Sequence, residues 1–111
     1  MILKVGTPML EKIGYKVLVA RSGKEAIQVY QKNRDLIKMV ILDMIMPQMS
    51  GGETFDQMRA TNPWVKVLLS SGYSINGEAQ EILNRGCHGF IQKPFNLREL
   101  SQRLGEMLSR P

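Results

Sequence analysis

Residues 38–43 have the sequence KMVILD, a nearly continuous apolar run that ends in a carboxylate. A short run of this kind is typical of a parallel strand that is buried on both faces of a sheet. Because a buried, unpaired carboxylate is costly, we expect Asp43 at the rim of the sheet, where it is exposed or compensated by other groups. The run therefore predicts a central strand with a chemically useful side chain at its end.

Short apolar runs and helical patterns alternate on both sides of this strand. Further strands are predicted at residues 15–20, 65–71 and 89–93. Two helices start at the capping boxes Ser22–Glu25 and Ser50–Glu53, and two more are expected at residues 77–85 and 96–108. This alternation predicts an α/β fold, in which an open parallel sheet carries helices on both faces.

The N-terminal residues 1–13 predict a helix rather than a strand. Their apolar residues fall roughly on one helical stripe: Ile2, Val5, Met9 and Ile13. Gly14 follows as a C-terminal cap. Pro8 leaves two versions open, because the helix either kinks there or begins at Thr7 with Pro8 in its first turn.

Composition narrows the class of protein. The length of 111 residues suits one domain, and its apolar runs are shorter than the roughly 20 residues that span a bilayer. A single cysteine, Cys87, excludes an internal disulfide framework, so we expect a cytoplasmic protein. The net charge is +5, but the basic residues are scattered without interleaved aromatics. We interpret them as a solvated surface and expect no direct nucleic-acid binding and no membrane contact.

Polar side chains end three of the predicted strands. Asp43 ends one, Ser70 and Ser71 end the next, and Lys93 ends the last. Functional groups of open parallel sheets collect at the carboxyl ends of the strands. A carboxylate can attack phosphorus, while a hydroxyl and an ammonium group can stabilise the oxygens of a transferring phosphoryl group. Each residue alone is compatible with a turn or a solvated edge, but their joint placement predicts a phosphoryl-transfer site.

Three segments resemble the receiver domains of response regulators in two-component signalling. Residues 42–51 (LDMIMPQMSG), 69–73 (LSSGY) and 89–95 (GFIQKPF) match the family motifs in order and spacing. The resemblance covers the whole chain, so we expect a single receiver domain over residues 1–111. It implies a flavodoxin-like, doubly wound sheet with strand order 2-1-3-4-5.

The same resemblance assigns roles to individual residues. Asp43 would be the phosphoacceptor, Ser71 would bind the phosphoryl oxygen and move inward, and Lys93 would pair with the phosphoaspartate. Phe90 would be an aromatic switch that follows Ser71. The backbone carbonyl of Ile45 would ligate Mg²⁺ together with Asp43.

Four further residues have structural roles in this resemblance. Pro47 and Gly51 would shape the loop after the phosphorylation site, and Gly72 is the small residue after the serine. The peptide bond before Pro94 is expected to be cis, which helps to aim the preceding lysine.

The sequence departs from the family at its start. Receivers begin with a strand that ends in adjacent acidic residues, which hold Mg²⁺, and neither is found here. Because residues 1–13 predict the first helix, we place this acidic pair and its strand upstream of Met1, outside the sequence. We therefore expect a receiver domain without its N-terminal strand, with a gap in the sheet between residues 15–20 and 38–43.

Three explanations of such a gap are open. The chain would be part of a longer protein in which Met1 is internal, which is the explanation that we favour. Otherwise it would receive the strand from another chain or rearrange its sheet in a dimer, or it would be a poorly folding truncation. The chain as given lacks the acidic pair of this metal site. Weak Mg²⁺ binding and poor phosphorylation follow.

The function implied is a signalling switch, not an enzyme acting on a separate substrate. A histidine kinase or histidine phosphotransfer protein would phosphorylate Asp43, and the surface of residues 77–108 would signal to a partner or to a second copy in a homodimer. The motifs lean toward receivers of hybrid sensor kinases. A pseudo-receiver that is never phosphorylated is the alternative. A small α/β enzyme is disfavoured, since the sequence has no Gly-rich phosphate loop and no nucleophile elbow.

Overall fold

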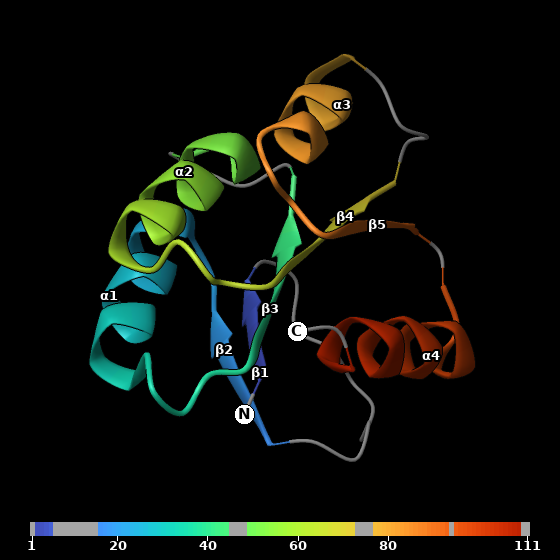
Figure 1. Cartoon of the computed structure of the whole chain (residues 1–111), viewed down its shortest axis with the longest axis horizontal. Helices are drawn as coiled ribbons and strands as arrows, with labels where there is room; N and C mark the ends of the chain where they lie inside the picture. The colour runs from blue at the N-terminus through green and yellow to red at the C-terminus, as the bar shows by residue number, and fades with distance from the viewer. Residues whose placement is uncertain (1, 6–15, 45–48, 73–76, 94, 110–111) are drawn as a thin grey trace.

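The computed structural model describes residues 2–5, 16–44, 49–72, 77–93 and 95–109 of the chain. Within them the elements follow the order β1 (Ile2–Val5), β2 (Val17–Ala20), α1 (Gly23–Asn33), β3 (Met39–Asp43), α2 (Gly51–Thr61), β4 (Val67–Ser71), α3 (Gly77–Asn84), β5 (Gly89–Gln92) and α4 (Leu97–Leu108). Figure 1 shows the helices arranged around a twisted sheet. None of the described helices is long and apolar enough to cross a bilayer.

The sheet has five parallel strands in the order β2-β1-β3-β4-β5. This confirms the predicted doubly wound fold and its strand order. The register places Asp43 opposite Ser70, and Ser71 opposite Gln92. Since all strands run the same way, the carboxyl ends of β3, β4 and β5 meet at one edge, as the sequence predicted.

The prediction of a missing first strand is wrong for the described residues. Ile2–Val5 form β1, which pairs with Val17–Ala20 on one side and with Met39–Leu42 on the other. The helix expected over residues 1–13 is therefore also wrong at residues 2–5. Residues 6–15, including Thr7 and Pro8, lie outside the described part of the chain. The gap expected in the sheet is filled by this chain's own residues.

The placement of the acidic pair upstream of Met1 stays a prediction. The first strand that the structure describes is β1, which begins at Ile2. Its carboxyl end is Val5, and the residues that follow in the sequence are Gly6 and Thr7. No acidic pair follows this strand in the sequence. Met1 itself is outside the described residues.

Residues 2–5 were assigned to a helix because a short strand and a segment of buried helix can have the same apolar pattern. A short apolar run cannot be assigned to one or the other by periodicity alone. Without β1, the facing edges of β2 and β3 would leave backbone N–H and C=O groups unpaired inside the sheet. Residues 2–5 supply those partners, and all four are buried. Non-local pairing therefore outweighs the weak helical stripe.

Two apolar cores lie on opposite faces of the sheet. The first joins β1, β3 and β4 to residues of α1, α2 and α3, among them Tyr30, Phe55 and Ile82. The second joins Ile2, Met39, Ile41, Leu68 and Ile91 to α4 residues Leu100, Leu104 and Met107. In Figure 1, α1 and α2 lie side by side on one face and α4 on the other. Helices thus cover both faces, as predicted.

The predicted helix starts are confirmed at atomic detail. The Ser22 and Ser50 hydroxyl oxygens each accept a hydrogen bond from a backbone N–H three residues later, both at 3.2 Å. Asn96 caps α4 in the same way, at 2.8 Å. Gly86, two residues after the end of α3, has a φ of 110°, a conformation that favours glycine. Local sequence therefore sets the ends of these helices.

Replacing Leu3 by alanine tests the position of β1. Leu3 is fully buried in the structure, whereas it lies off the apolar stripe of the helical alternative. We expect Leu3→Ala to lower the free energy of unfolding by about 2–5 kcal/mol, measured by urea denaturation with circular dichroism. Leu36→Ala, at a side chain that is 57% exposed, is the matched control and should change it little. Equal, small effects at both positions would contradict the placement of β1 inside the sheet.

Candidate functional site

Asp43 is the last residue of β3, between β1 and β4. Its side chain is 5% exposed, so the carboxylate is almost completely removed from water. A charge in this position requires nearby partners of opposite charge and hydrogen-bond donors. The sequence left open whether Asp43 is exposed or compensated, and the structure shows it buried and paired.

Three groups converge on the carboxylate oxygen Oδ1 of Asp43. The hydroxyl of Ser70, at the end of β4, donates a hydrogen bond to it. The ammonium group of Lys93, directly after β5, lies 2.9 Å away. The ammonium group of Lys4, from β1, lies 3.2 Å away. Residues at or next to the carboxyl ends of four neighbouring strands therefore build the site.

Lys4 is the residue that sequence analysis missed. Its side chain is 3% exposed, and its Nζ also donates to the backbone oxygen of Val5 at 3.3 Å. Burial lowers the pKa of Lys4 below its ordinary value, and Lys93 adds to this, while the nearby Asp43 carboxylate opposes it by favouring the charged form. The available signal was a lysine inside the apolar run of residues 2–5, which becomes meaningful only once that run is a strand.

Ser70 is a second difference from the roles that the sequence assigned. The sequence placed both serines at the strand end and gave the phosphoryl contact to Ser71. In the sheet, Ser70 is the register partner of Asp43 and donates to it, and successive strand residues point to opposite faces. Ser71 is buried, and its backbone oxygen accepts a hydrogen bond from the N–H of Lys93 at 2.6 Å. The expected switching role of Ser71 stays a prediction.

The surroundings of the remaining predicted site residues differ. Phe90 is half-buried against the first core, and its backbone oxygen accepts from Arg103 of α4 at 2.9 Å. Gly51 is tightly enclosed, because a Cβ there would lie 2.8 Å from the Cα of Met44, which fits the predicted loop role. Around Gly72 a Cβ would meet no atom within 4 Å, so space does not explain that glycine. Three predicted residues, Ile45, Pro47 and Pro94, lie outside the described residues.

The described residues do not fit a Mg²⁺ site. Mg²⁺ prefers six oxygen ligands in octahedral geometry, commonly with one or two carboxylates. In the described segments, no group of three or more histidine, cysteine, aspartate or glutamate residues could hold a metal ion. The carboxylate of Asp43 instead faces two ammonium groups, which repel a cation.

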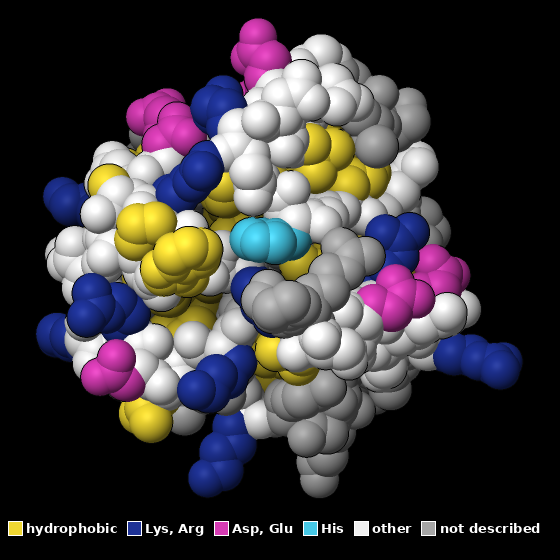
Figure 2. Space-filling model, viewed as in Figure 1, with side chains coloured by type: hydrophobic (Ala, Val, Ile, Leu, Met, Phe, Trp, Pro, Cys, Tyr) yellow, Lys and Arg dark blue, Asp and Glu magenta, His cyan; other side chains and the backbone are white. Residues whose placement is uncertain are grey.

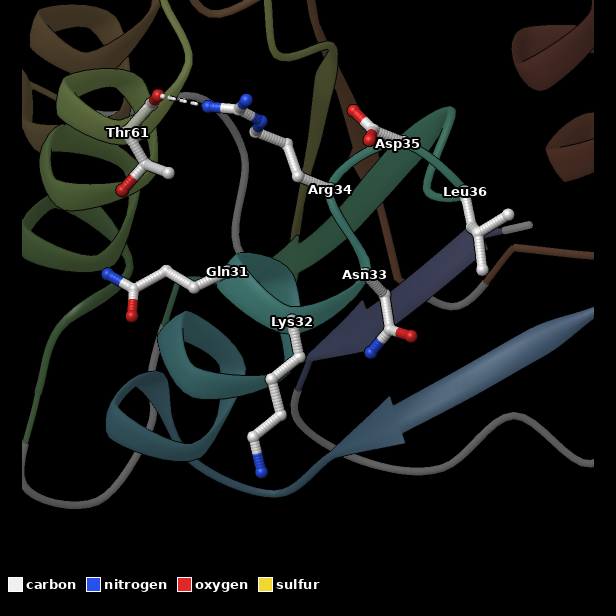
Figure 3. Close-up of a pocket in the computed structure, with 7 residues that line it drawn as sticks. All are labelled: Gln31, Lys32, Asn33, Arg34, Asp35, Leu36 and Thr61. Carbon is white, nitrogen blue, oxygen red and sulfur yellow. Dashed lines mark hydrogen bonds between the residues drawn. The ribbon is translucent and has the colours of Figure 1, made fainter.

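A separate pocket of about 760 Å³ lies away from this site. Its lining is mostly the end of α1 and the turn before β3: Gln31, Lys32, Asn33, Arg34, Asp35, Leu36 and Thr61 (Figure 3). The Arg34 guanidinium donates to the backbone oxygen of Thr61 at 3.3 Å. Because these residues precede β3 or β4, the pocket lies at the opposite end of the strands from Asp43, and it carries no part of the candidate chemistry.

The sheet is doubly wound and parallel, and an ion-paired carboxylate lies at the end of its central strand. These features define a class of α/β domains whose functional groups lie at the carboxyl ends of the strands. A model of the response regulator receiver domain family matches residues 1–105, and the chain belongs to this family. It is therefore a regulatory domain of two-component signalling. Its relatives include the sensor kinase CckA of Brucella abortus, 32% identical over 105 residues. That match covers 95% of this chain but 11% of the kinase.

Solved structures agree on the fold. A response regulator receiver domain protein from Clostridium thermocellum has a TM-score of 0.90 at 25% identity, covering 98% of this chain and 94% of that one. The receiver domain of a sensor histidine kinase from Pseudomonas aeruginosa has a TM-score of 0.85 at 22% identity, covering 98% and 97%. A magnesium ion is coordinated in the active-site cleft of that domain. At this identity the likeness shows the fold alone.

Replacing Asp43 by asparagine tests the internal ion pairs. The change leaves the buried ammonium group of Lys4 without its counter-charge, so we expect the free energy of unfolding to fall by about 3 kcal/mol in urea denaturation at neutral pH. Adding Lys4→Met to Asp43→Asn should recover most of this loss. Asp56→Asn is the control, since its ion pair with Arg85 is exposed and should contribute less than about 1 kcal/mol. A stability gain in Asp43→Asn would contradict the pairing.

Proposed function

We propose that Asp43 accepts a phosphoryl group from the phosphohistidine of a histidine kinase or histidine phosphotransfer protein. The observation that carries this proposal is the convergence of Ser70, Lys93 and Lys4 on one oxygen of a strand-end carboxylate. A hydroxyl and two ammonium groups are donors of the kind that stabilise a phosphoryl group. Family membership supports the same class of reaction.

The proposed reaction is a phosphoryl transfer between two side chains. A carboxylate oxygen of Asp43 attacks phosphorus and forms a P–O bond. The P–N bond to the donor histidine breaks, and its electron pair remains on the imidazole nitrogen. The product is an acyl phosphate, whose additional negative charge is offset by Lys4 and Lys93.

A route for the signal follows from contacts beyond Asp43. Lys93 contacts the carboxylate through its side chain and the Ser71 backbone oxygen through its N–H. A hydrogen bond from the Arg103 guanidinium to the backbone oxygen of Phe90 then links β5 to α4. We propose that phosphorylation shifts the Ser71 and Phe90 positions and biases the surface of residues 77–108.

The partners follow from this role. The phosphodonor is a histidine kinase or phosphotransfer protein, and the reader of the surface is an output domain or a second copy of the chain. Likeness to CckA favours a receiver of a hybrid sensor kinase. Figure 2 shows Lys and Arg spread around the face in view, with acidic side chains among them. This scatter fits a cytoplasmic signalling domain that does not itself bind nucleic acid or membranes.

A pseudo-receiver is the second candidate function. It is favoured by the burial of the Asp43 side chain, which is 5% exposed, and by the ion pairs that already neutralise it. A carboxylate held in this way is less available as a nucleophile. In this case the domain would act as an interaction module without phosphorylation.

Labelling with a phosphodonor separates the two functions. We expect acetyl phosphate, or a phosphorylated histidine kinase, to add one phosphoryl group to the chain, detected by intact-protein mass spectrometry and removed by hydroxylamine. Asp43→Asn should abolish the addition, whereas Asp35→Asn, at an exposed aspartate, should not. Absence of labelling under every metal condition would support the pseudo-receiver instead.

The two serines are expected to contribute unequally to labelling. Because Ser70 donates to the carboxylate that attacks phosphorus, Ser70→Ala should slow the rate of labelling by about tenfold or more. Ser71→Ala should slow it less, but should weaken any phosphorylation-dependent change in the fluorescence or NMR spectrum. A larger rate effect at Ser71 would restore the role that the sequence motif assigned to it.

A further inference from the structure

The charged groups around Asp43 carry a net positive charge. Two ammonium groups, from Lys4 and Lys93, lie within 3.2 Å of one carboxylate oxygen, so this cluster carries one positive charge in excess. The described residues supply no acidic cluster that could hold a metal ion. The site therefore favours an added anion and disfavours an added cation.

The placement of Lys4 explains how it reaches the site from inside a strand. Lys4 is the register partner of Ile41, two residues before Asp43. Residues 41 and 43 point to the same face of the sheet, so the Lys4 stem runs along that face toward the carboxylate. Ile2 and Ile41 belong to the core under α4, which gives the stem an apolar surface to cover. The lysine is thus a built part of the site, not a mobile surface charge.

We propose that Lys4 takes the place of the divalent cation in this receiver domain, so that the Asp43 site is closed to Mg²⁺ and receives its phosphoryl group without metal. The part concerning phosphorylation rests on the proposed function. Phosphorylation of Asp43 adds one negative charge, which balances the cluster. A bound Mg²⁺ would instead place two further positive charges beside two ammonium groups.

Metal binding and metal dependence are tested on the full 111-residue chain. Mg²⁺ binding is measured by calorimetry, and Mn²⁺ is used as a paramagnetic probe of amides near Asp43. At millimolar concentrations of metal, the wild type should show no metal binding that depends on Asp43. Its binding signal should therefore equal that of Asp43→Asn. Lys4→Asp, which replaces the ammonium group with a second carboxylate, should gain such binding. Lys24→Met, at an exposed lysine of α1, is the control and should behave as wild type.

Acetyl phosphate labelling is then compared in EDTA and in Mg²⁺. Wild-type rates should agree within about twofold, and Lys4→Met should lose about tenfold or more of the EDTA rate, as for removal of a charge-stabilising donor. Lys4→Met keeps an apolar stem in the core, so it remains informative if Lys4→Asp does not fold. Circular dichroism of each variant confirms the fold.

The outcomes separate this inference from the proposed function. Labelling that requires Mg²⁺, or Asp43-dependent Mg²⁺ binding by the wild type, overturns the inference while the phosphoacceptor function stands. Labelling in EDTA that depends on Lys4 supports both. If nothing is labelled, the phosphoacceptor function fails, and metal binding decides the inference: exclusion of Mg²⁺ by the wild type supports it, and binding overturns it.

Discussion

The carboxylate of Asp43 is a charge held almost out of contact with water at the end of the central strand, and much of the structure depends on neutralising it. Its oxygen is contacted by groups from β1, β4 and the end of β5. Because β3 lies between β1 and β4, the strand order is what allows partners to reach the carboxylate from both sides. Sheet topology and site electrostatics are therefore parts of one arrangement. A different strand order would leave a buried charge without compensation.

Features governed by local sequence were predictable, and features governed by strand pairing were not. The helix starts at Ser22 and Ser50 follow from a side chain and a backbone N–H three residues apart, so the sequence alone contains both partners. The assignment of β1 depends on two edges that lie far along the chain. The choice between Ser70 and Ser71 depends on register, which a one-residue shift would reverse. The role of Lys4 could not be predicted, because it depends both on the long-range pairing of β1 and on its register with β3.

Membership of the receiver family does not by itself determine the metal chemistry of this site. The family match extends over residues 1–105, and most of those positions build strands, helices and cores. Metal chemistry depends on a few acidic groups, and the described residues offer two lysines around Asp43 instead. A shared fold therefore does not transfer the magnesium of the Pseudomonas aeruginosa domain to this chain. The chain also spans only 11% of CckA, so activities of the whole kinase do not transfer.

Lys4 also couples the chemistry of the site to the stability of the sheet. A lysine in the interior of a central strand costs desolvation free energy that an apolar residue would not, and a nearby carboxylate offsets it. Lys4 is tolerated in β1 because Asp43 is charged, and Asp43 is tolerated at the end of β3 because Lys4 and Lys93 are charged. Any change of charge at Asp43 therefore acts on β1, the strand that joins β2 to the rest of the sheet. In this arrangement the first strand is part of the site itself. A phosphoryl group on Asp43 would therefore act on contacts to both neighbouring strands, β1 and β4.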